Sequence, residues 1–256
     1  MLSHDLYYPD IPAIPEFSGI SRRNDHWQRQ AITLWLIAQG FSLRVEVQWI
    51  VARFFGTDHR SGALMQILSR FRDKELLKTK TLALRIFSGG RTQFTVVCLT
   101  DKGRELVQAL GWQVHETEWE RMQRLHEKGN YQARHTAAVL AFVYQARLRG
   151  WTAGVMPEVD AVWFFPDALV EKDRESYYVE VELDEQKLSK WHNMARHQSA
   201  IALCAHTPDH RRLLLDEAEP AALTNKCTRL GTDLRTLFEH SQGGNLLWLE
   251  KKENIT

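Results

Sequence analysis

Apolar residues recur at helical spacing three times in the first third of the chain and then alternate in two short runs. The helical spacing predicts three helices, because side chains three and four positions apart share one helix face. The two runs predict a hairpin, and the pair Gly89-Gly90 between them suits a tight tip. Thr100 can cap a fourth helix. We expect these elements at His26–Gln39, Arg44–Phe55, Ser61–Lys74, Leu82–Phe87, Gln93–Leu99 and Asp101–Leu110.

The rest of the chain predicts a mixture of helices and strands. A charged amphipathic stretch from Trp112 to about Lys128 indicates a linker helix. Its residues Trp119, Met122 and Leu125 can pack on a neighbouring element or on a second copy of the chain. An α-β-β-β-α-β order follows, at Arg134–Arg149, Ala161–Phe165, Asp167–Val170, Tyr177–Leu183, Gln186–Gln198 and Ala200–Ala205. The last segments predict helices at Thr207–Glu219 and Thr224–Glu239 and an edge strand at Leu246–Glu250.

These elements predict an α/β protein with two domains. An extended arm would cover residues 1–23, the first domain residues 24–112, the linker helix residues 113–129 and the second domain residues 130–256. The net charge is only +1, yet residues 59–104 hold ten Lys and Arg against three Asp and Glu. A local basic block in a nearly neutral chain indicates a surface for a polyanion. The three cysteines show no metal-site or disulfide spacing.

The strand over Tyr177–Leu183 carries the candidate chemistry. Its valines and leucine alternate with Tyr178, Glu180 and Glu182, so the two glutamates share one face of the strand. A hairpin with the preceding strand would bring Asp167 near Glu180. Three carboxylates at a strand edge form a hard-oxygen site of the kind that Mg²⁺ or Mn²⁺ prefers. An ordinary hairpin with a solvated acidic face is the alternative.

This stretch resembles the core of the PD-(D/E)xK nucleases, in which a PD hairpin precedes a strand that ends in (D/E)-x-K. Here the motif reads Pro166-Asp167 and then Glu180-Val181-Glu182, so a glutamate stands at the usual lysine position. Some members carry a lysine on the following helix instead. The resemblance implies that the carboxylates hold the metal and that a helix lysine stabilises charge during DNA cleavage. It assigns these roles to Asp167, Glu180 and Glu182 as metal ligands and to Lys187 or Lys190 as the lysine.

Three helices followed by two strands also give the order of a winged helix-turn-helix. The run Leu99-Thr100-Asp101-Lys102-Gly103-Arg104-Glu105-Leu106 resembles the segment after the wing in many bacterial regulators of that class. The resemblance implies that the third helix reads double-stranded DNA and that the wing meets phosphates. A protein-binding winged helix is the alternative. The candidate DNA-binding residues are Arg60, Ser61, Gln66, Arg70, Lys74, Lys78, Lys80 and Arg91.

The combination resembles the replication-relaxation family of plasmids and integrative elements, which joins a winged helix to a nuclease-like domain. His135 at a helix start, the Pro166-Asp167-Ala168 segment, Glu180 and Lys190 carry this resemblance. It implies a role in the maintenance or control of mobile DNA. Two functions stay open: a Mg²⁺-dependent DNA endonuclease, or a sequence-specific regulator of transcription or replication whose nuclease-like domain is inactive and serves dimerisation or partner binding. His135 is either a ligand or phosphate contact, or a structural residue.

The sequence also carries expectations about location and assembly. No apolar run approaches the length of a membrane span, and the first residues lack the apolar core of a signal peptide. We therefore expect a cytoplasmic protein without a membrane partner. A homodimer joined through the linker helix is one option, and a simple strut between domains is the other.

Overall fold

The computed structural model of the protein describes residues 21–58, 62–86, 92–126, 133–156, 165–183, 188–240 and 246–253. The chain forms two compact units, mainly residues 8–131 and 132–256, which we call the N-terminal unit and the C-terminal unit. The first contains helices and a β-hairpin, and the second a six-stranded mixed sheet with interspersed helices. The expected α/β class is confirmed at this level.

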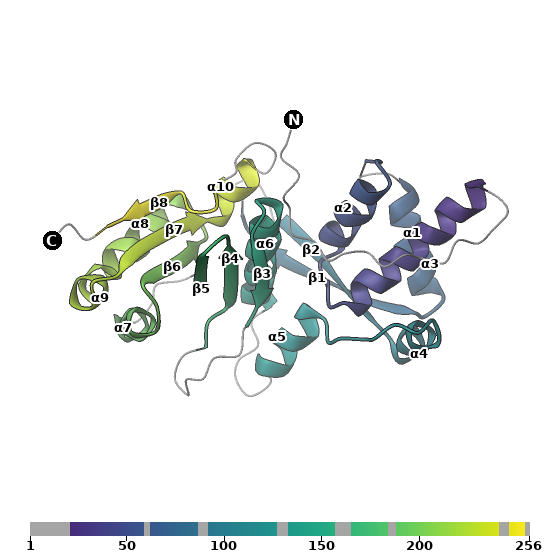
Figure 1. The fold of residues 1–256 in the computed structure, drawn as a ribbon, viewed down its shortest axis with the longest axis horizontal. Helices are drawn as coiled ribbons and strands as arrows, with labels where there is room; N and C mark the ends of the chain where they lie inside the picture. The colour runs from purple at the N-terminus through teal and green to yellow at the C-terminus, as the bar shows by residue number, and fades with distance from the viewer. Residues whose placement is uncertain are drawn as a thin grey trace. The chain divides into compact units, whose positions relative to one another are not determined.

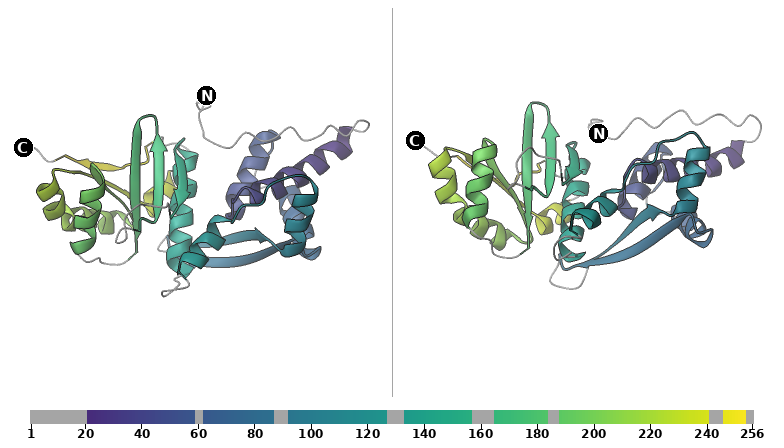
Figure 2. Two further views of the ribbon diagram at one scale, coloured as in Figure 1. Left: turned by 60° about the horizontal axis from the view of Figure 1, so that its bottom comes forward. Right: turned by 90° about the horizontal axis from the view of Figure 1, so that it is seen from below.

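The N-terminal unit begins with three helices, as predicted: α1 (Ser21–Ala38), α2 (Arg44–Phe54) and α3 (Gly62–Asp73). The strands β1 (Leu77–Leu84) and β2 (Thr92–Leu99) then pair as a long ribbon (Figure 2). Two helices follow, α4 (Asp101–Ala109) and α5 (Glu118–His126). β1 starts earlier than the predicted Leu82, because residues 78–81 are all exposed and give no apolar alternation.

An apolar core joins these helices to β2. Ile32 and Leu36 of α1, Val51 of α2 and Val97 of β2 are fully buried in it. The three helical periodicities in the sequence point at this core, because each amphipathic helix must bury its apolar stripe against another element. Thr100 caps α4 as expected, since its side chain accepts a hydrogen bond from Gly103 N.

The predicted linker helix begins later than expected, at Glu118 of α5. Residues 112–117 are not helical. Two backbone hydrogen bonds attach this segment to the end of α1: His115 N donates to Ala38 O at 2.7 Å, and Glu118 N donates to Gly40 O at 2.9 Å. The segment is therefore fixed to the N-terminal unit and does not begin a free helical strut.

A capping box begins α5. Thr117 N donates to Glu120 Oε2 at 3.0 Å, and Glu120 N donates to Thr117 Oγ1 at 3.3 Å. Trp119 and Met122 are buried within the chain, and Leu125 is exposed. Of the three apolar residues that we expected on this helix, only Leu125 is therefore open to a further partner.

The C-terminal unit opens with α6 (Ala133–Leu148), and its strands follow one another in the sheet in chain order, β3-β4-β5-β6-β7-β8 (Figure 1). The first three strands are antiparallel, β5, β6 and β7 are parallel, and β8 is antiparallel to β7. The strands are β3 (Thr152–Val155), β4 (Ala168–Lys172), β5 (Glu175–Glu182), β6 (Ala200–Ala205), β7 (Thr228–Asp233) and β8 (Glu250–Lys252). The helices between them are α7 (Leu188–His197), α8 (Pro208–Glu217), α9 (Glu219–Asn225) and α10 (Leu234–Glu239).

Helices cover both faces of this sheet (Figures 1 and 2). Ile201, Leu203 and Ala205, which alternate along β6, pack with Trp191 of α7 and Leu214 of α8. Helices α6 and α10 contact each other and the sheet on its opposite face. The central strand β6 is buried along its whole length, as expected for a parallel strand between two helical layers.

The predicted helix over Thr224–Glu239 is wrong. The backbone leaves α9 at Lys226, which has a left-handed φ of 54°. The chain then forms strand β7 before it turns into α10. A Cβ added at Gly231 of this strand would lie 2.7 Å from Leu215 Cδ1, so the glycine allows α8 to approach β7 closely.

Of two further predicted strands, one lies largely outside the described residues and the other is displaced. The first strand of the sheet is β3, which precedes the predicted Ala161–Phe165. Residues 161–164 lie outside the described residues, and Phe165 is not in a strand. The predicted edge strand Leu246–Glu250 begins later, because β8 pairs with β7 only from Glu250 onward.

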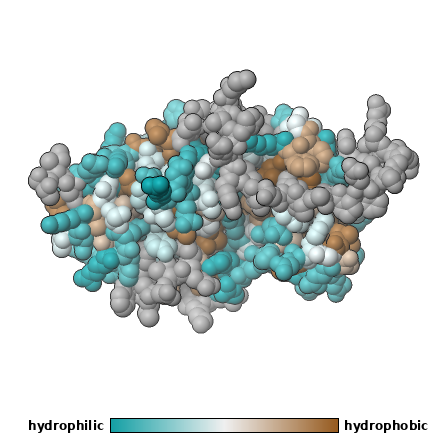
Figure 3. Space-filling model, in the orientation of Figure 1, coloured by the Kyte–Doolittle hydropathy of each residue, from teal (hydrophilic) through white to brown (hydrophobic). Residues whose placement is uncertain are grey.

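The surface of the described residues is mainly polar in the view of Figure 3. Large exposed apolar side chains are scattered over both units, among them Phe54, Leu106, Leu110, Phe165 and Leu246. Single exposed apolar residues are ordinary on protein surfaces and define no site by themselves.

Candidate functional site

The register of the sheet brings Asp167 beside Glu180. Ala168 of β4 pairs with Val179 of β5, and Asp167 N donates to Val179 O at 3.1 Å. Glu180 pairs with Leu203 and Glu182 with Ala205 across the parallel β5–β6 ladder. Paired residues point to the same face of a sheet, so both glutamates lie on the face that α7 covers. The alternation in the sequence predicted this shared face.

Asp167 is held by two groups. Its Oδ2 accepts a hydrogen bond from Val181 N at 2.8 Å and lies 3.2 Å from His135 Nε2. His135 Nε2 also lies 3.1 Å from Val181 O. Burial by itself raises the pKa of Asp167, but the charge and hydrogen bond of His135, with smaller contributions from Lys190 and Val181 N, lower this pKa to about 2.

His135 lies in the first turn of α6 and reaches the strand from that helix. Burial disfavours its charged form and lowers its pKa, but the nearby Asp167 carboxylate more than reverses the effect, so the pKa of His135 is raised. The imidazolium form is therefore favoured beside Asp167. This hydrogen bond gives His135 the structural role that was one of its two alternatives in the sequence, and it also places His135 next to the buried carboxylates.

Lys190 of α7 contacts both glutamates. Its Nζ lies 2.8 Å from Glu180 Oε2 and forms a second, shorter ion pair with Glu182 Oε1. Burial raises the pKa of Glu182, and burial with the charge of Asp167 raises the pKa of Glu180 well above its usual range, although Lys190 opposes both shifts. The pKa of Lys190 is raised, because its carboxylate neighbours outweigh the effect of burial.

We call Asp167, Glu180, Glu182, Lys190 and His135 the charged cluster. Its three carboxyl groups outnumber its two basic groups, so the fully ionised cluster carries net negative charge. Burying charge without full compensation is unfavourable. Burial is the main cause of the raised pKa values of Glu180 and Glu182, and the charge of Asp167 adds to it. The cluster therefore has a chemical reason to take up a further cation or a proton.

The described residues contain no group of three or more His, Cys, Asp and Glu side chains arranged to hold a metal ion. The ammonium of Lys190 is the cation that contacts Glu180 and Glu182. Lys187, the other helix lysine expected at this site, lies outside the described residues. Lys190, the second lysine expected there, reaches the carboxylates of Glu180 and Glu182.

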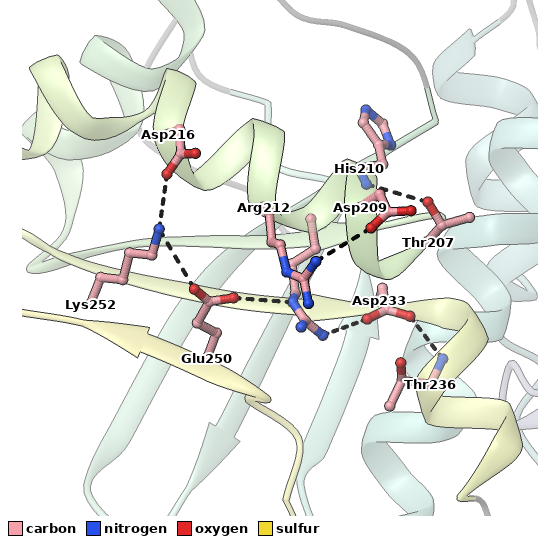
Figure 4. Close-up of polar contacts among 10 residues, drawn as sticks. Thr207, Asp209, His210, Arg212, Asp216, Asp233, Thr236, Glu250 and Lys252 are labelled. Carbon is pink, nitrogen blue, oxygen red and sulfur yellow. Dashed lines mark hydrogen bonds and ion pairs between the residues drawn. The ribbon is translucent and has the colours of Figure 1, made fainter.

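A second network of charged residues in the same unit joins helix α8 to the strands β7 and β8. Arg211 of α8 pairs with Asp233 at the end of β7 at 2.5 Å and with Glu250 of β8 at 3.4 Å. Lys252 pairs with Asp216 at 2.9 Å and with Glu250 at 3.6 Å (Figure 4). Asp233 also caps α10. These pairs tie α8 to β7 and β8, and we assign them a structural role.

Gln198, which the sequence did not single out, positions the strand of the cluster. Its Nε2 donates to Tyr178 O at 2.9 Å, and its Oε1 accepts from Tyr178 N at 2.8 Å. The side-chain amide thus pairs with β5 as another strand would, two residues before Glu180. A lone glutamine after a helix gives no signal of such a contact.

The candidate DNA-binding residues that the structure describes are exposed. Gln66, Arg70 and Lys74 follow one another at four-residue spacing along α3 and its end, so they form one stripe. Arg70 also contacts His26 of α1, with its Nη1 at 3.0 Å from the imidazole Nε2. The strand β1 presents two further exposed cations, Lys78 and Lys80. Three other candidates lie outside the described residues: Arg60, Ser61 and Arg91.

Comparisons of the chain with protein-family models, with curated proteins and with solved structures found no match. Among the described residues, no helix is both long and apolar enough to cross a membrane.

Proposed function

We propose that the protein binds double-stranded DNA through its N-terminal unit and that the charged cluster of its C-terminal unit is a site for metal-dependent DNA cleavage. The observation that carries the cleavage proposal is the burial of three carboxyl groups, whose basic partners among the described residues include Lys190 and His135. Clusters of buried groups with strongly shifted pKa values concentrate at functional sites. Stability alone gives no reason to gather an excess of buried negative charge at one strand end.

The donor types in the cluster suit a hard divalent cation, although the described side chains are not arranged to hold one. Asp167, Glu180 and Glu182 offer carboxylate oxygens, which are the ligands that Mg²⁺ and Mn²⁺ prefer. When all three carboxyl groups are ionised, the net negative charge of the cluster favours such an ion. Bound there, the ion would polarise a phosphate and lower the pKa of an attacking water.

The other residues of the cluster have roles that follow from their contacts. Lys190 lies against Glu182, the residue at the usual lysine position of the PD-(D/E)xK motif. This contact supports the hypothesis that the motif lysine has moved to α7, where Lys190 would stabilise the developing charge of a phosphate in the transition state. His135 holds Asp167 by the hydrogen bond that lowers its pKa.

The DNA-binding proposal rests on the distribution of charge over the N-terminal unit. The exposed stripe Gln66–Arg70–Lys74 can enter a major groove, because Arg and Gln read base edges. Lys78 and Lys80 on the ribbon can meet phosphates. These placements support a winged helix of the kind that the replication-relaxation resemblance implies, and with it a role in mobile-DNA maintenance or control.

A second function is favoured by one observation. Lys190 already contacts two of the three carboxylates, and no metal group is found among the described residues. In this alternative, the protein is a sequence-specific regulator whose C-terminal unit is inactive and serves dimerisation or partner binding. The ion pairs of Lys190 would then have a structural role.

Metal-dependent stabilisation separates the two functions. Melting temperature would be measured with and without Mn²⁺ in the native protein, in Asp167→Asn and Glu180→Gln, and in the matched control Asp216→Asn from the structural network. An ion that binds the folded state raises the melting temperature by mass action. We expect Mn²⁺ to stabilise the native protein and the control, and to stabilise the two cluster variants much less.

Nicking of supercoiled DNA would be followed on the same four proteins. We expect cleavage by the native protein and the Asp216→Asn control and none by the cluster variants, while duplex affinity stays nearly unchanged in all four. The endonuclease proposal would be refuted if Mn²⁺ gave no stabilisation and the protein cleaved neither supercoiled, linear nor single-stranded DNA. The regulator would then be the supported function.

A further inference from the structure

Met65 of α3 is a large apolar side chain on the exposed surface of the proposed DNA-reading helix. It is 44% exposed, whereas Leu64, Ile67 and Leu68 of the same helix are buried in the core of the N-terminal unit. Met65 therefore lies outside the apolar stripe that packs α3 against the other helices. At about 100° per residue it is a neighbour of Gln66, the first residue of the exposed stripe.

Gln48 of α2 holds Met65 at this surface. Gln48 is only 7% exposed, and its Nε2 donates a hydrogen bond to Met65 Sδ at 2.9 Å. Methionine has three rotatable bonds and adapts easily to its surroundings, so this contact restricts an otherwise adaptable side chain. A side chain that is already held in place loses less conformational entropy when a partner binds. The contact therefore prepares Met65 to meet a partner at the surface.

The first part of α3 carries uncharged groups. Residues Gly62 to Gln66 include no charged side chain, and the first charged residue of the helix is Arg70. When a helix of this type lies in the major groove, residues near its N-terminus contact base edges. An apolar group and an amide would therefore meet the bases, and the arginines would follow further along the helix.

These two groups match the edges of an A·T base pair. In the major groove adenine presents an acceptor at N7 and a donor at N6, and a glutamine amide can bond to both at once. Thymine presents its C5-methyl group, which favours an apolar contact. Guanine presents two acceptors at this edge, for which arginine or lysine is the usual partner. Gln66 and Met65 together therefore favour A·T pairs over G·C pairs.

We propose that the first two turns of α3 select A·T base pairs, with Gln66 hydrogen-bonding to an adenine edge and Met65 contacting the methyl group of a neighbouring thymine. This inference rests on the proposed DNA binding by the N-terminal unit and deepens it by naming the bases that are read. It is independent of the charged cluster in the C-terminal unit.

The test begins with selection from a library of randomised DNA duplexes by the full chain. The selected duplexes are sequenced, and one of them is then titrated by fluorescence anisotropy. The variants are Gln66→Ala and Met65→Ala, and the matched control is Leu106→Ala, which removes another exposed apolar side chain of the same unit, 38% exposed on α4. Met65→Leu, which keeps an apolar side chain of similar size, is the conservative variant.

The native protein and Leu106→Ala should select the same site, with A·T pairs at adjacent positions. Gln66→Ala should bind the selected duplex about tenfold more weakly and lose the preference at one of these pairs, as expected for the loss of a bidentate base contact.

Replacing the thymines of the selected duplex by uracil, one at a time, removes only their methyl groups. At one position this change should weaken binding of the native protein, Leu106→Ala and Met65→Leu by about fourfold, as expected for one buried methyl group. Met65→Ala should bind the thymine and uracil duplexes equally, because the contact with the methyl group is gone.

A selected site without A·T preference would overturn the inference and leave DNA binding in place. Equal loss on uracil replacement in the native protein and Met65→Ala would do the same, and so would no loss in either. Recovery of no duplex from the library would refute the DNA-binding proposal itself. Should circular dichroism show that Met65→Ala is unfolded, Met65→Ser takes its place in the comparison.

Discussion

Replacing Gly103 of α4 by alanine should destabilise the N-terminal unit, although alanine is the better helix former. A Cβ at this position would lie 2.1 Å from Leu76 O and 3.2 Å from Leu99 Cδ2. The nearer atom belongs to the backbone and cannot rotate away. That carbonyl also accepts a hydrogen bond from Thr100 N at 3.0 Å, so α4 is attached to Leu76 at the point of closest approach.

The expected loss of stability follows from three contributions. The helix and the Leu76 backbone must separate by about 1 Å to reach ordinary van der Waals contact. Overpacking of this kind costs about 1–3 kcal/mol. Loss of the Thr100 N–Leu76 O hydrogen bond adds about 1 kcal/mol. The higher helix propensity of alanine offsets about 0.5–1 kcal/mol of this loss. The net destabilisation is about 2 kcal/mol, which lowers the melting temperature of a unit of this size by roughly 10 °C.

Urea unfolding of the full chain, followed by circular dichroism, measures the free energy, and hydrogen exchange of the Thr100 amide shows whether the loss is local to α4. The matched control is Gly62→Ala at the first residue of α3, where an added Cβ meets nothing within 4 Å. This control should be neutral or stabilising by up to about 1 kcal/mol. If Gly103→Ala unfolds at the same urea concentration as the native protein, the close approach to Leu76 is wrong.

Two further predictions concern the sites. The double change Arg70→Ala with Lys74→Ala should weaken duplex binding in an anisotropy titration and reduce the slope of log affinity against log salt by about 0.9 for each phosphate that the variant no longer neutralises. Arg72→Ala, outside the exposed stripe, should change both less, and an equal reduction by either variant would refute α3 as the DNA-reading helix. For His135, the raised folded-state pKa means that its stabilisation is complete below the ordinary value of 6.5 and is lost as pH rises through the folded value. Urea midpoints should therefore fall as pH rises above 6.5 in the native protein, and a fall of equal size in His135→Gln would contradict this assignment.

Much of the local structure could be predicted, because it depends on residues that are close in the chain. Helical periodicity located α1, α2, α3 and α6, and the cap residue Thr100 indicated α4. The prediction of β6 matched Ala200–Ala205 in full. Strand β7 was missed because its residues also fit a helical period, and the features that end α9 are the left-handed Lys226 and the close packing at Gly231, both properties of the folded chain.

For the candidate site too, the sequence predicted the local arrangement but not the contacts between distant elements. Alternation by itself put Glu180 and Glu182 on one face, and the hairpin put Asp167 beside them, because a two-residue period is a property of any strand. Only the tertiary structure decided that this face is buried under α7, that Lys190 reaches both glutamates, and that His135 holds Asp167. These contacts join elements that are far apart in the chain, and their electrostatic effect depends on burial that no local pattern specifies.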